Sequence, residues 1–186
     1  MNHTYPSASA ELQAMRSEFD LGFARAAQTQ AAAVQNFLGI RLAGDAFAIR
    51  AGDIAGLYVD RRIMPIPTDV STLLGVVGFR SLIVPVFDLA ALLGYTRTAS
   101  PRWIMLFRTG EPVALAFEHF ETHFSAGMNN IVGAPQLPAA MPDSARAHLF
   151  DAVRTDAAIR PIIHMQSLLE PLQQPLNSPQ RQRSTS

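Results

Sequence analysis

Residues 73–94, LLGVVGFRSLIVPVFDLAALLG, contain two apolar runs separated by a short polar step. The runs cover residues 73–79 and 82–87, are rich in valine, leucine and phenylalanine, and leave only Arg80 and Ser81 between them. Apolar runs of strand length around a two-residue connection predict a β-hairpin. Because a charged side chain is costly to bury unpaired, we expect Arg80 to lie exposed at the hairpin tip.

A short helix is predicted directly after this hairpin. Asp88 is a favoured N-cap residue, residues 89–93 suit a helix, and Gly94 suits its end. The same order of strand, turn, strand and short helix with a Leu-Leu pair recurs over residues 148–170. This repetition predicts two similar β-rich halves that share one core.

The segments around the hairpin extend the β prediction. Further hairpins are predicted over residues 37–49, 103–117 and 149–163, with a closing helix over 165–169. Ile54 and Leu57 are three residues apart, which predicts one or two helical turns over residues 51–57. Residues 129–144 contain three prolines and are predicted to be mostly loop. The chain is therefore predicted to be mainly β.

The two ends of the chain differ from this centre. Four apolar residues fall on one face of a helix predicted over residues 11–27: Leu12, Met15, Phe19 and Phe23. The sequence leaves open whether this helix packs on its own domain or docks on a partner. We divide the chain into an N-terminal helix and linker (1–34), one folded domain (35–171) and a polar tail predicted to be disordered (172–186).

The composition excludes several classes of function. The 186 residues are 48% hydrophobic and 16% charged, which is enough to bury a core. Fifteen basic and fifteen acidic residues give a net charge of zero, so no field of either sign attracts nucleic acid or an anionic membrane. The absence of cysteine and lysine excludes thiol nucleophiles, cysteine–zinc sites and Schiff-base chemistry. No signal-like or membrane-spanning stretch occurs, so we expect a cytoplasmic protein without membrane insertion.

His119 and His123 form the one pattern that resembles a metal site. Four residues apart on a helix, they would share a zinc ion, and a small metal-dependent hydrolase is the enzymatic alternative. The segment does not read H-E-x-x-H, and we favour a solvated strand or loop. No G-x-S-x-G motif and no glycine-rich phosphate loop occurs. We therefore predict no catalytic residue, no cofactor and no metal.

Residues 74–94 resemble the hallmark of the CheW family of chemotaxis adaptors, which reads roughly L-x-G-V-x-N-L-R-G-x-x-V-P-V-x-D-L-x-x-x-L-G. The matching residues are Gly75, Val76, Arg80, Val84, Pro85, Val86, Asp88, Leu89, Leu93 and Gly94. The resemblance covers about residues 35–171. It departs from the family at Gly78, where the family has asparagine, at Ser81, where it has glycine, and at Gly56, where many members carry an acidic residue.

The resemblance implies a CheW-like fold of two small five-stranded, SH3-like β-barrels around a shared hydrophobic core. It implies a scaffold without catalysis that bridges the signalling tip of a methyl-accepting chemoreceptor and the regulatory domain of a CheA-type histidine kinase. The implied partner-binding residues are Arg80 and Phe79 at the hairpin tip, with Ile54 and Leu57 before it. The departures motivate an alternative: a divergent CheW-like module of a gliding, pili or developmental system with a different partner.

Overall fold

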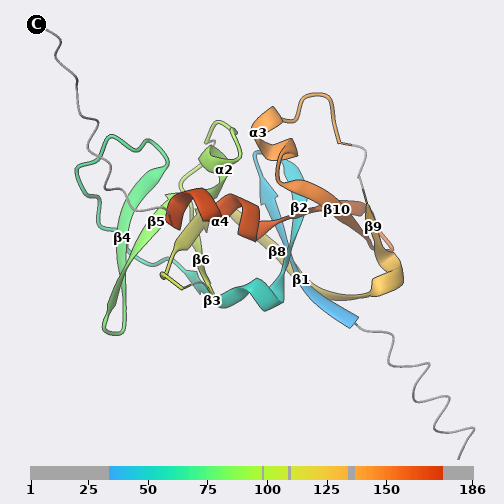
Figure 1. Ribbon diagram of the computed structural model, residues 1–186, viewed down its shortest axis with the longest axis horizontal. Coiled ribbons are helices and arrows are strands. Elements are labelled where there is room, and N and C mark those ends of the chain that lie inside the picture. The colour runs from blue at the N-terminus through green and yellow to red at the C-terminus, as the bar shows by residue number, and fades with distance from the viewer. Residues whose placement is uncertain (1–33, 98, 109, 134–136, 174–186) are drawn as a thin grey trace, which may run out of the picture. The chain divides into compact units, whose positions relative to one another are not determined.

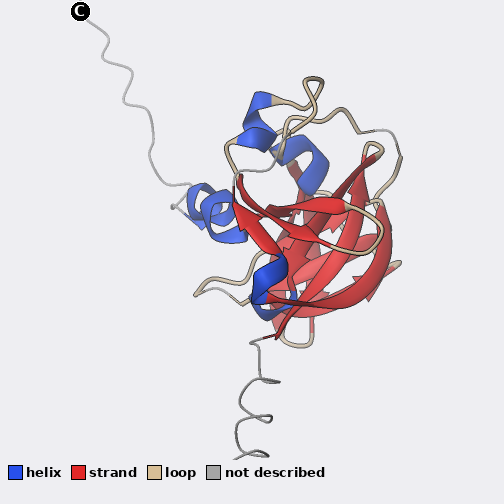
Figure 2. Ribbon diagram, turned by 90° about the vertical axis from the view of Figure 1, so that its right-hand side faces the viewer, coloured by secondary structure: helices blue, strands red, loops and turns tan. Residues whose placement is uncertain are grey.

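The computed structural model describes residues 34–97, 99–108, 110–133 and 137–173. The helix predicted over residues 11–27 and residues 174–186 of the predicted tail lie outside this range, so both stay predictions, whereas residues 172 and 173, also predicted to be tail, end the last helix. Within the described range the chain is mainly β, as predicted (Figure 1). Figure 2 shows that strands make up the body of this part and that the short helices lie at its periphery.

The strands form two sheets. The first sheet has the order β8 (His119–Gly127), β1 (Val34–Leu42), β2 (Asp45–Arg50), β11 (Ile159–Ile163), β10 (Leu149–Arg154) and β9 (Ile131–Gly133). The second has the order β3 (Ile54–Val59), β6 (Trp103–Phe107), β7 (Ala114–Phe117), β5 (Leu82–Asp88) and β4 (Leu73–Phe79). The helices are η1 (Ala51–Asp53), α2 (Leu89–Leu92), η2 (Met128–Asn130), α3 (Asp143–Arg146) and α4 (Met165–Gln173).

The two sheets repeat one topology. In each, the second strand of one hairpin pairs in parallel with the second strand of another: Val86 of β5 lies opposite Ala114 of β7, and Ile162 of β11 lies opposite Ala48 of β2. The first sheet has one strand more than the predicted five, namely β9, which pairs with β10. Its counterpart in the second sheet is a single bridge between Met64 and Val76, closed by two backbone hydrogen bonds of 2.9 Å.

The two halves exchange strands. β3 follows the β1–β2 hairpin of the first sheet in sequence but pairs with β6 in the second. β8 follows the β6–β7 hairpin of the second sheet but lies beside β1 in the first. Neither sheet is therefore built from one continuous half of the chain. Because each half completes the other, we expect the domain to unfold as one unit.

Alternation along the strands creates three cores. A shared core receives side chains from both sheets, such as Ile40 and Leu115. A second core lies inside the barrel formed by the second sheet, and a third lies inside the barrel formed by the first sheet. The inward positions of these two barrels are often small, as at Ala48 and Ala114, because a barrel of few strands has a narrow interior. The predicted shared core is confirmed.

The central hairpin forms as predicted. β4 pairs antiparallel with β5, with Gly78 opposite Ile83 at the end next to the turn. The Asp88 carboxylate caps α2 by accepting hydrogen bonds from the backbone N–H groups of Ala90 and Ala91, at 3.0 and 3.3 Å. Gly94 ends the helix with a φ of +79°, a left-handed conformation that favours glycine.

Two local predictions are wrong. The helical turns predicted over residues 51–57 form only at Ala51–Asp53, as η1, and Ile54 begins strand β3. A register shift between Ile54 and Gly56 inserts one extra residue, so Ile54 and Leu57 reach the shared core although they are three residues apart. The bulge therefore produces the same three-residue spacing of core positions that a helix would produce. The segment 129–144, predicted to be mostly loop, also contains β9 and α3.

Candidate functional sites at the barrel junction and the hairpin tip

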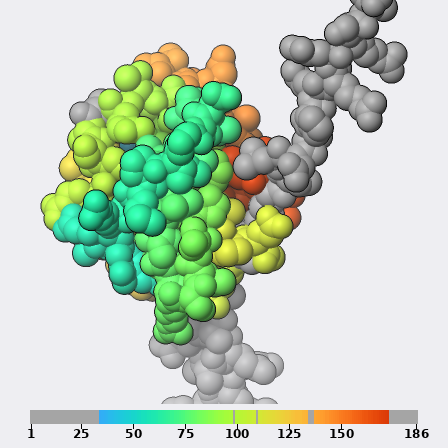
Figure 3. Space-filling view, turned by 90° about the vertical axis from the view of Figure 1, so that its left-hand side faces the viewer, coloured from blue at the N-terminus to red at the C-terminus, as the bar shows by residue number. Residues whose placement is uncertain are grey.

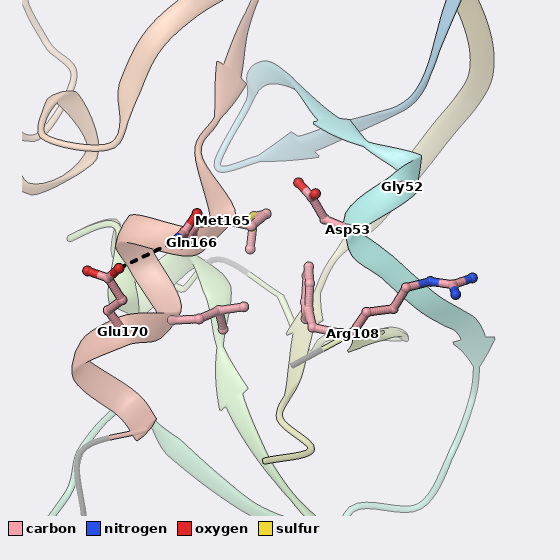
Figure 4. Close-up of a pocket in the computed structure, with 8 residues that line it drawn as sticks. Gly52, Asp53, Arg108, Met165, Gln166 and Glu170 are labelled. Atoms are coloured by element: carbon pink, nitrogen blue, oxygen red, sulfur yellow. Dashed lines mark hydrogen bonds between the residues drawn. The ribbon is translucent and has the colours of Figure 1, made fainter. Parts of the chain in front are cut away.

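A groove lies where the two sheets meet beneath α4 (Figure 4). We call it the junction groove; its volume is about 380 Å³ and its lining residues are Gly52, Asp53, Phe107, Arg108, Met165, Gln166, Leu169 and Glu170. The buried side chains of Phe107, Met165 and Leu169 make its apolar floor. Asp53 stands on one side and Gln166 and Glu170 of α4 on the other, so the rim is polar.

The rim of the junction groove is held by local contacts. The Nε of Arg108 donates to the carbonyl oxygen of Ile54 at 3.0 Å, and the Arg108 backbone N–H donates to the Asp53 carbonyl at 3.1 Å. Gln166 donates to the Glu170 carboxylate at 3.4 Å along α4. These contacts fix the beginning of β3 against the end of β6, so the groove is preformed.

A second groove opens at the tip of the β4–β5 hairpin. We call it the tip groove; its volume is about 480 Å³ and its lining residues are Ala55, Tyr58, Arg61, Phe79, Arg80, Leu82 and Leu106. Figure 3 shows the hairpin, in green, projecting at the lower edge of this face. Beside the groove, Leu82 is 55% exposed and Ile83 is 74% exposed, which is unusual for large apolar side chains in a hairpin otherwise packed on a core.

The predicted partner-binding residues are not all in one place. Arg80 is exposed at the turn and Phe79 is 8% exposed, and both line the tip groove. Ile54, also 8% exposed, and the half-buried Leu57 pack in the shared core and line neither groove. Their predicted role in binding stays a prediction.

Five residues of the tip groove were not predicted from the sequence, and Tyr58 and Arg61 are the most informative of them. The Tyr58 ring lies against the Phe79 ring, with centroids 4.7 Å apart, and the Arg61 guanidinium lies over the Tyr58 ring at 5.5 Å from its centroid. The contact between Tyr58 and Phe79 joins residues 21 positions apart, whereas Arg61 is three residues from Tyr58. The two adjacent arginines, Arg61 and Arg62, were the only local signal.

The histidine pair does not have the geometry of a zinc site. His119 and His123 both lie on strand β8 and both are exposed, so the helical spacing required by the hydrolase alternative is absent. In the described part of the chain, no group of three or more histidine, cysteine, aspartate or glutamate side chains is placed to hold a metal ion. The prediction that this segment is a solvated strand is confirmed.

A serine and a histidine meet at the start of α4. The Ser167 hydroxyl lies 2.9 Å from Nδ1 of His148 and donates to the His164 carbonyl oxygen at 2.8 Å. A hydroxyl has one hydrogen, so His148 Nδ1 must be the donor to Ser167, and it is not arranged to remove the serine proton. Burial, together with the nearby His164, lowers the pKa of His148 below its ordinary value of 6.5. The pair anchors α4 to the connection before β10.

The described domain thus consists of two strand-exchanged β-barrels, and its surface grooves include the junction groove and the tip groove. The sequence matches the family profile of the CheW-like domain over residues 36–170, so the chain belongs to the CheW-like domain family, a family of scaffold adaptors in chemotaxis signalling. The prediction made from residues 74–94 is confirmed.

The fold is also similar to that of a solved structure. The crystal structure of the scaffolding protein TtCheW from Thermoanaerobacter tengcongensis superposes with a TM-score of 0.63 at 20% sequence identity, over 73% of this chain and 92% of that one. A comparison with curated protein sequences finds no significant match. Within the described residues, no helix combines the length and apolar character needed to cross a membrane.

Proposed function

We propose that this protein is a non-enzymatic adaptor of a bacterial chemosensory array, which couples methyl-accepting chemoreceptors to a CheA-type histidine kinase in the cytoplasm. An adaptor needs two partner sites that are occupied together. The observation that carries the proposal is the match to the CheW-like domain over residues 36–170, and the junction and tip grooves, formed by different elements, offer two such sites.

The junction groove suits a helix of the receptor tip. Its floor is apolar and its rim is polar, which is the pattern that receives one face of an amphipathic helix. α4 supplies one wall and η1 the other, so a bound helix would contact both halves of the domain. The hairpin tip is then available for the kinase regulatory domain, and Arg80 and Phe79 contribute to that contact.

A divergent CheW-like system is the second candidate, and Gly78 is the observation that favours it. A Cβ at Gly78 would meet no atom within 4 Å, so the fold does not require glycine at this exposed position. Gly78 and the exposed Ile83 opposite it give the outer hairpin face a bare apolar surface. This surface suits a partner other than the one implied by the family's asparagine.

Bulky substitutions at exposed glycines test the proposal. A Cβ at Gly52, Gly78 or Gly133 would meet no atom within 4 Å, so tryptophan fits at each without a clash at Cβ. G52W fills the junction groove, G78W covers the hairpin face, and G133W on β9 is the matched control. Binding is measured by co-sedimentation with receptor-containing membranes and a CheA-type kinase from the same genome.

We expect the wild type and G133W to carry the kinase into the receptor pellet. G52W should lose the receptor but keep the kinase, and G78W should do the reverse. If the wild type recruits no kinase to the receptors, the adaptor function is wrong. If recruitment occurs but the two variants behave like G133W, the assignment of the junction groove to the receptor and of the outer hairpin face to the kinase is wrong.

A further inference from the structure

The floor of the tip groove is a stack of three side chains. Arg61 lies over the ring of Tyr58, and Tyr58 lies against Phe79. The Tyr58 ring also covers Gly56, because a Cβ built there would lie 2.8 Å from the ring and its hydroxyl oxygen. A larger residue at position 56 would displace the Tyr58 ring, so glycine at this position allows the ring to lie at the floor of the groove. The result is an aromatic and apolar floor with guanidinium groups from Arg61 and Arg80 beside it.

The charge of these two arginines is not neutralised within the described residues. Six other arginines have carboxylate partners within 4.0 Å: Arg41, Arg50, Arg97, Arg102, Arg146 and Arg160. Across the described ranges, no ion pair joins Arg61 or Arg80 to a carboxylate, and none of the residues that line the tip groove is acidic. The groove is an uncompensated positive site on a domain whose other arginines are largely paired.

Arg80 occupies a costly backbone conformation. Its φ is +53°, in the left-handed region that favours glycine or asparagine. Neighbouring Ser81 is exposed, and no hydrogen bond or ion pair within the described residues holds the Arg80 side chain. The two-residue turn between the paired Phe79 and Leu82 requires this conformation, and it directs an arginine side chain away from the core at the hairpin tip.

We infer that the tip groove binds an acidic segment of a protein partner, in which an apolar side chain packs on Tyr58 and Phe79 while carboxylates on either side pair with Arg61 and Arg80. The inference rests on the proposed adaptor function and specifies the chemistry of the partner's surface. Charge complementarity selects this occupant: planar guanidinium groups receive carboxylates through paired hydrogen bonds, and the aromatic floor receives an aliphatic side chain.

The test uses the full-length protein and two fluorescein-labelled synthetic peptides. One peptide has two leucines flanked on each side by two glutamates within glycine–serine ends, and the other has glutamines in place of the glutamates. Anisotropy titrations to 1 mM protein are run at 50 and 500 mM NaCl. We expect the glutamate peptide to bind about fivefold more tightly at low salt, because two exposed charge pairs contribute modestly and are screened by salt.

The variants separate this groove from charge in general. R61Q/R80Q should bind both peptides equally, whereas R62Q/R154Q removes the same two charges from exposed positions that do not line the groove and should keep the preference. Gln does not alter the backbone requirement at position 80. Equal binding of the two peptides by the wild type, no binding of either up to 1 mM, or a preference that survives R61Q/R80Q would each overturn the inference.

A second measurement separates this inference from the proposed function. The kinase regulatory domain is titrated against the wild type and both double variants. Loss of about fivefold in affinity only with R61Q/R80Q supports the inference. If R61Q/R80Q binds the kinase domain as tightly as the wild type does, the inference is wrong but the adaptor function is not affected. If the wild type binds neither the receptor nor the kinase, the adaptor function itself is wrong.

Discussion

The two barrels share a topology but differ in the ion pairs at the end that lies next to the turn of the β10–β11 or β4–β5 hairpin. In the first barrel, Glu121 receives hydrogen bonds from Arg41 at 2.7 Å and from Arg160 at 2.5 Å, and this network closes the barrel end. In the second, the corresponding end is the tip groove, with Arg61 and Arg80 and no acidic residue in its lining. At this end of the barrels, Arg41 and Arg160 pair with Glu121, whereas Arg61 and Arg80 have no carboxylate partner among the described residues.

The turns of the two hairpins show the same contrast. The β10–β11 turn satisfies itself: Thr155 and Ala158 exchange backbone and side-chain hydrogen bonds of 2.8 to 3.1 Å. The β4–β5 turn places Arg80 at a positive φ beside exposed Leu82 and Ile83. The first turn is therefore held by its own hydrogen bonds, whereas the second leaves large apolar side chains exposed beside it.

The largest expected loss of stability comes from a substitution that opens the Met64–Val76 bridge of the second barrel. A Cβ at Gly75 would collide with the carbonyl oxygen of Met64, and the φ of +139° is itself unfavourable for alanine. G75A should therefore cost about 3 kcal/mol of stability, because the Met64–Val76 bridge must open. Urea unfolding measures the loss. Gly133 lies on β9, the counterpart of that bridge in the first barrel, and a Cβ there would meet no atom within 4 Å. G133A is therefore the control and should change stability by less than about 1 kcal/mol. Equal losses in G75A and G133A would contradict this prediction.

The helices after the two hairpins differ in their anchors. Asp88, 2% exposed, caps α2 and pairs with Arg97 at 2.6 Å, whereas α4 is anchored by Ser167 and His148. D88A should cost about 2 kcal/mol in a thermal or urea melt, since it removes an N-cap and a buried partner of Arg97. D143A, an exposed carboxylate in the first turn of α3, is the matched control and should cost less than about 1 kcal/mol.

His148 makes the anchor of α4 depend on pH. Its folded pKa is lowered, so the unfolded chain binds a proton more readily than the folded one. The contribution is therefore fully present above the unfolded pKa of 6.5 and is lost as pH falls through the folded pKa. Stability should fall below pH 6.5 in the wild type and fall less in H148N. Parallel curves for the two proteins between pH 7.5 and 5 would exclude this role.

The network of the first barrel should show an acid dependence in a lower window. The hydrogen bonds from Arg160 and Arg41 lower the pKa of Glu121 below its ordinary 4.5, against burial, which raises it. This stabilisation is present above pH 4.5 and is lost as pH falls through the folded pKa. E121Q should cost about 1 kcal/mol at pH 7, where the pair is partly exposed, and progressively less as pH falls below 4.5 toward 3. Urea midpoints at both pH values check the difference.

The smallest expected change in stability is that of a substitution at Arg80, in the β4–β5 turn. R80G places the residue type that tolerates a positive φ at position 80, so stability should stay the same or rise by up to about 1 kcal/mol. Removal of the guanidinium should weaken binding to the receptor–kinase complex by about 1–3 kcal/mol if Arg80 is an anchor of the interface. A pull-down and a melting curve on the same sample measure both. Loss of stability would show that Arg80 is structural.

The site was predictable in part. Arg80 was predicted at the exposed tip because a two-residue turn between apolar strands leaves its side chain no other place. Phe79 was predicted as a partner residue, and it lies in a barrel core while also lining the tip groove. The junction groove was not predicted, since its walls are residues 52–53, 107–108 and 165–170, which only folding brings together.

The sequence by itself determined the features that depend on neighbours along the chain. The β4–β5 hairpin, the Asp88 cap and the glycine that ends α2 follow from local propensity and turn geometry, which act over a few residues. The tertiary structure alone decided the exchange of β3 and β8 between the barrels, the bulge that brings Ile54 and Leu57 to one core, and the stack of Arg61, Tyr58 and Phe79. These depend on pairings between residues far apart in sequence, where the gain in packing outweighs any local preference.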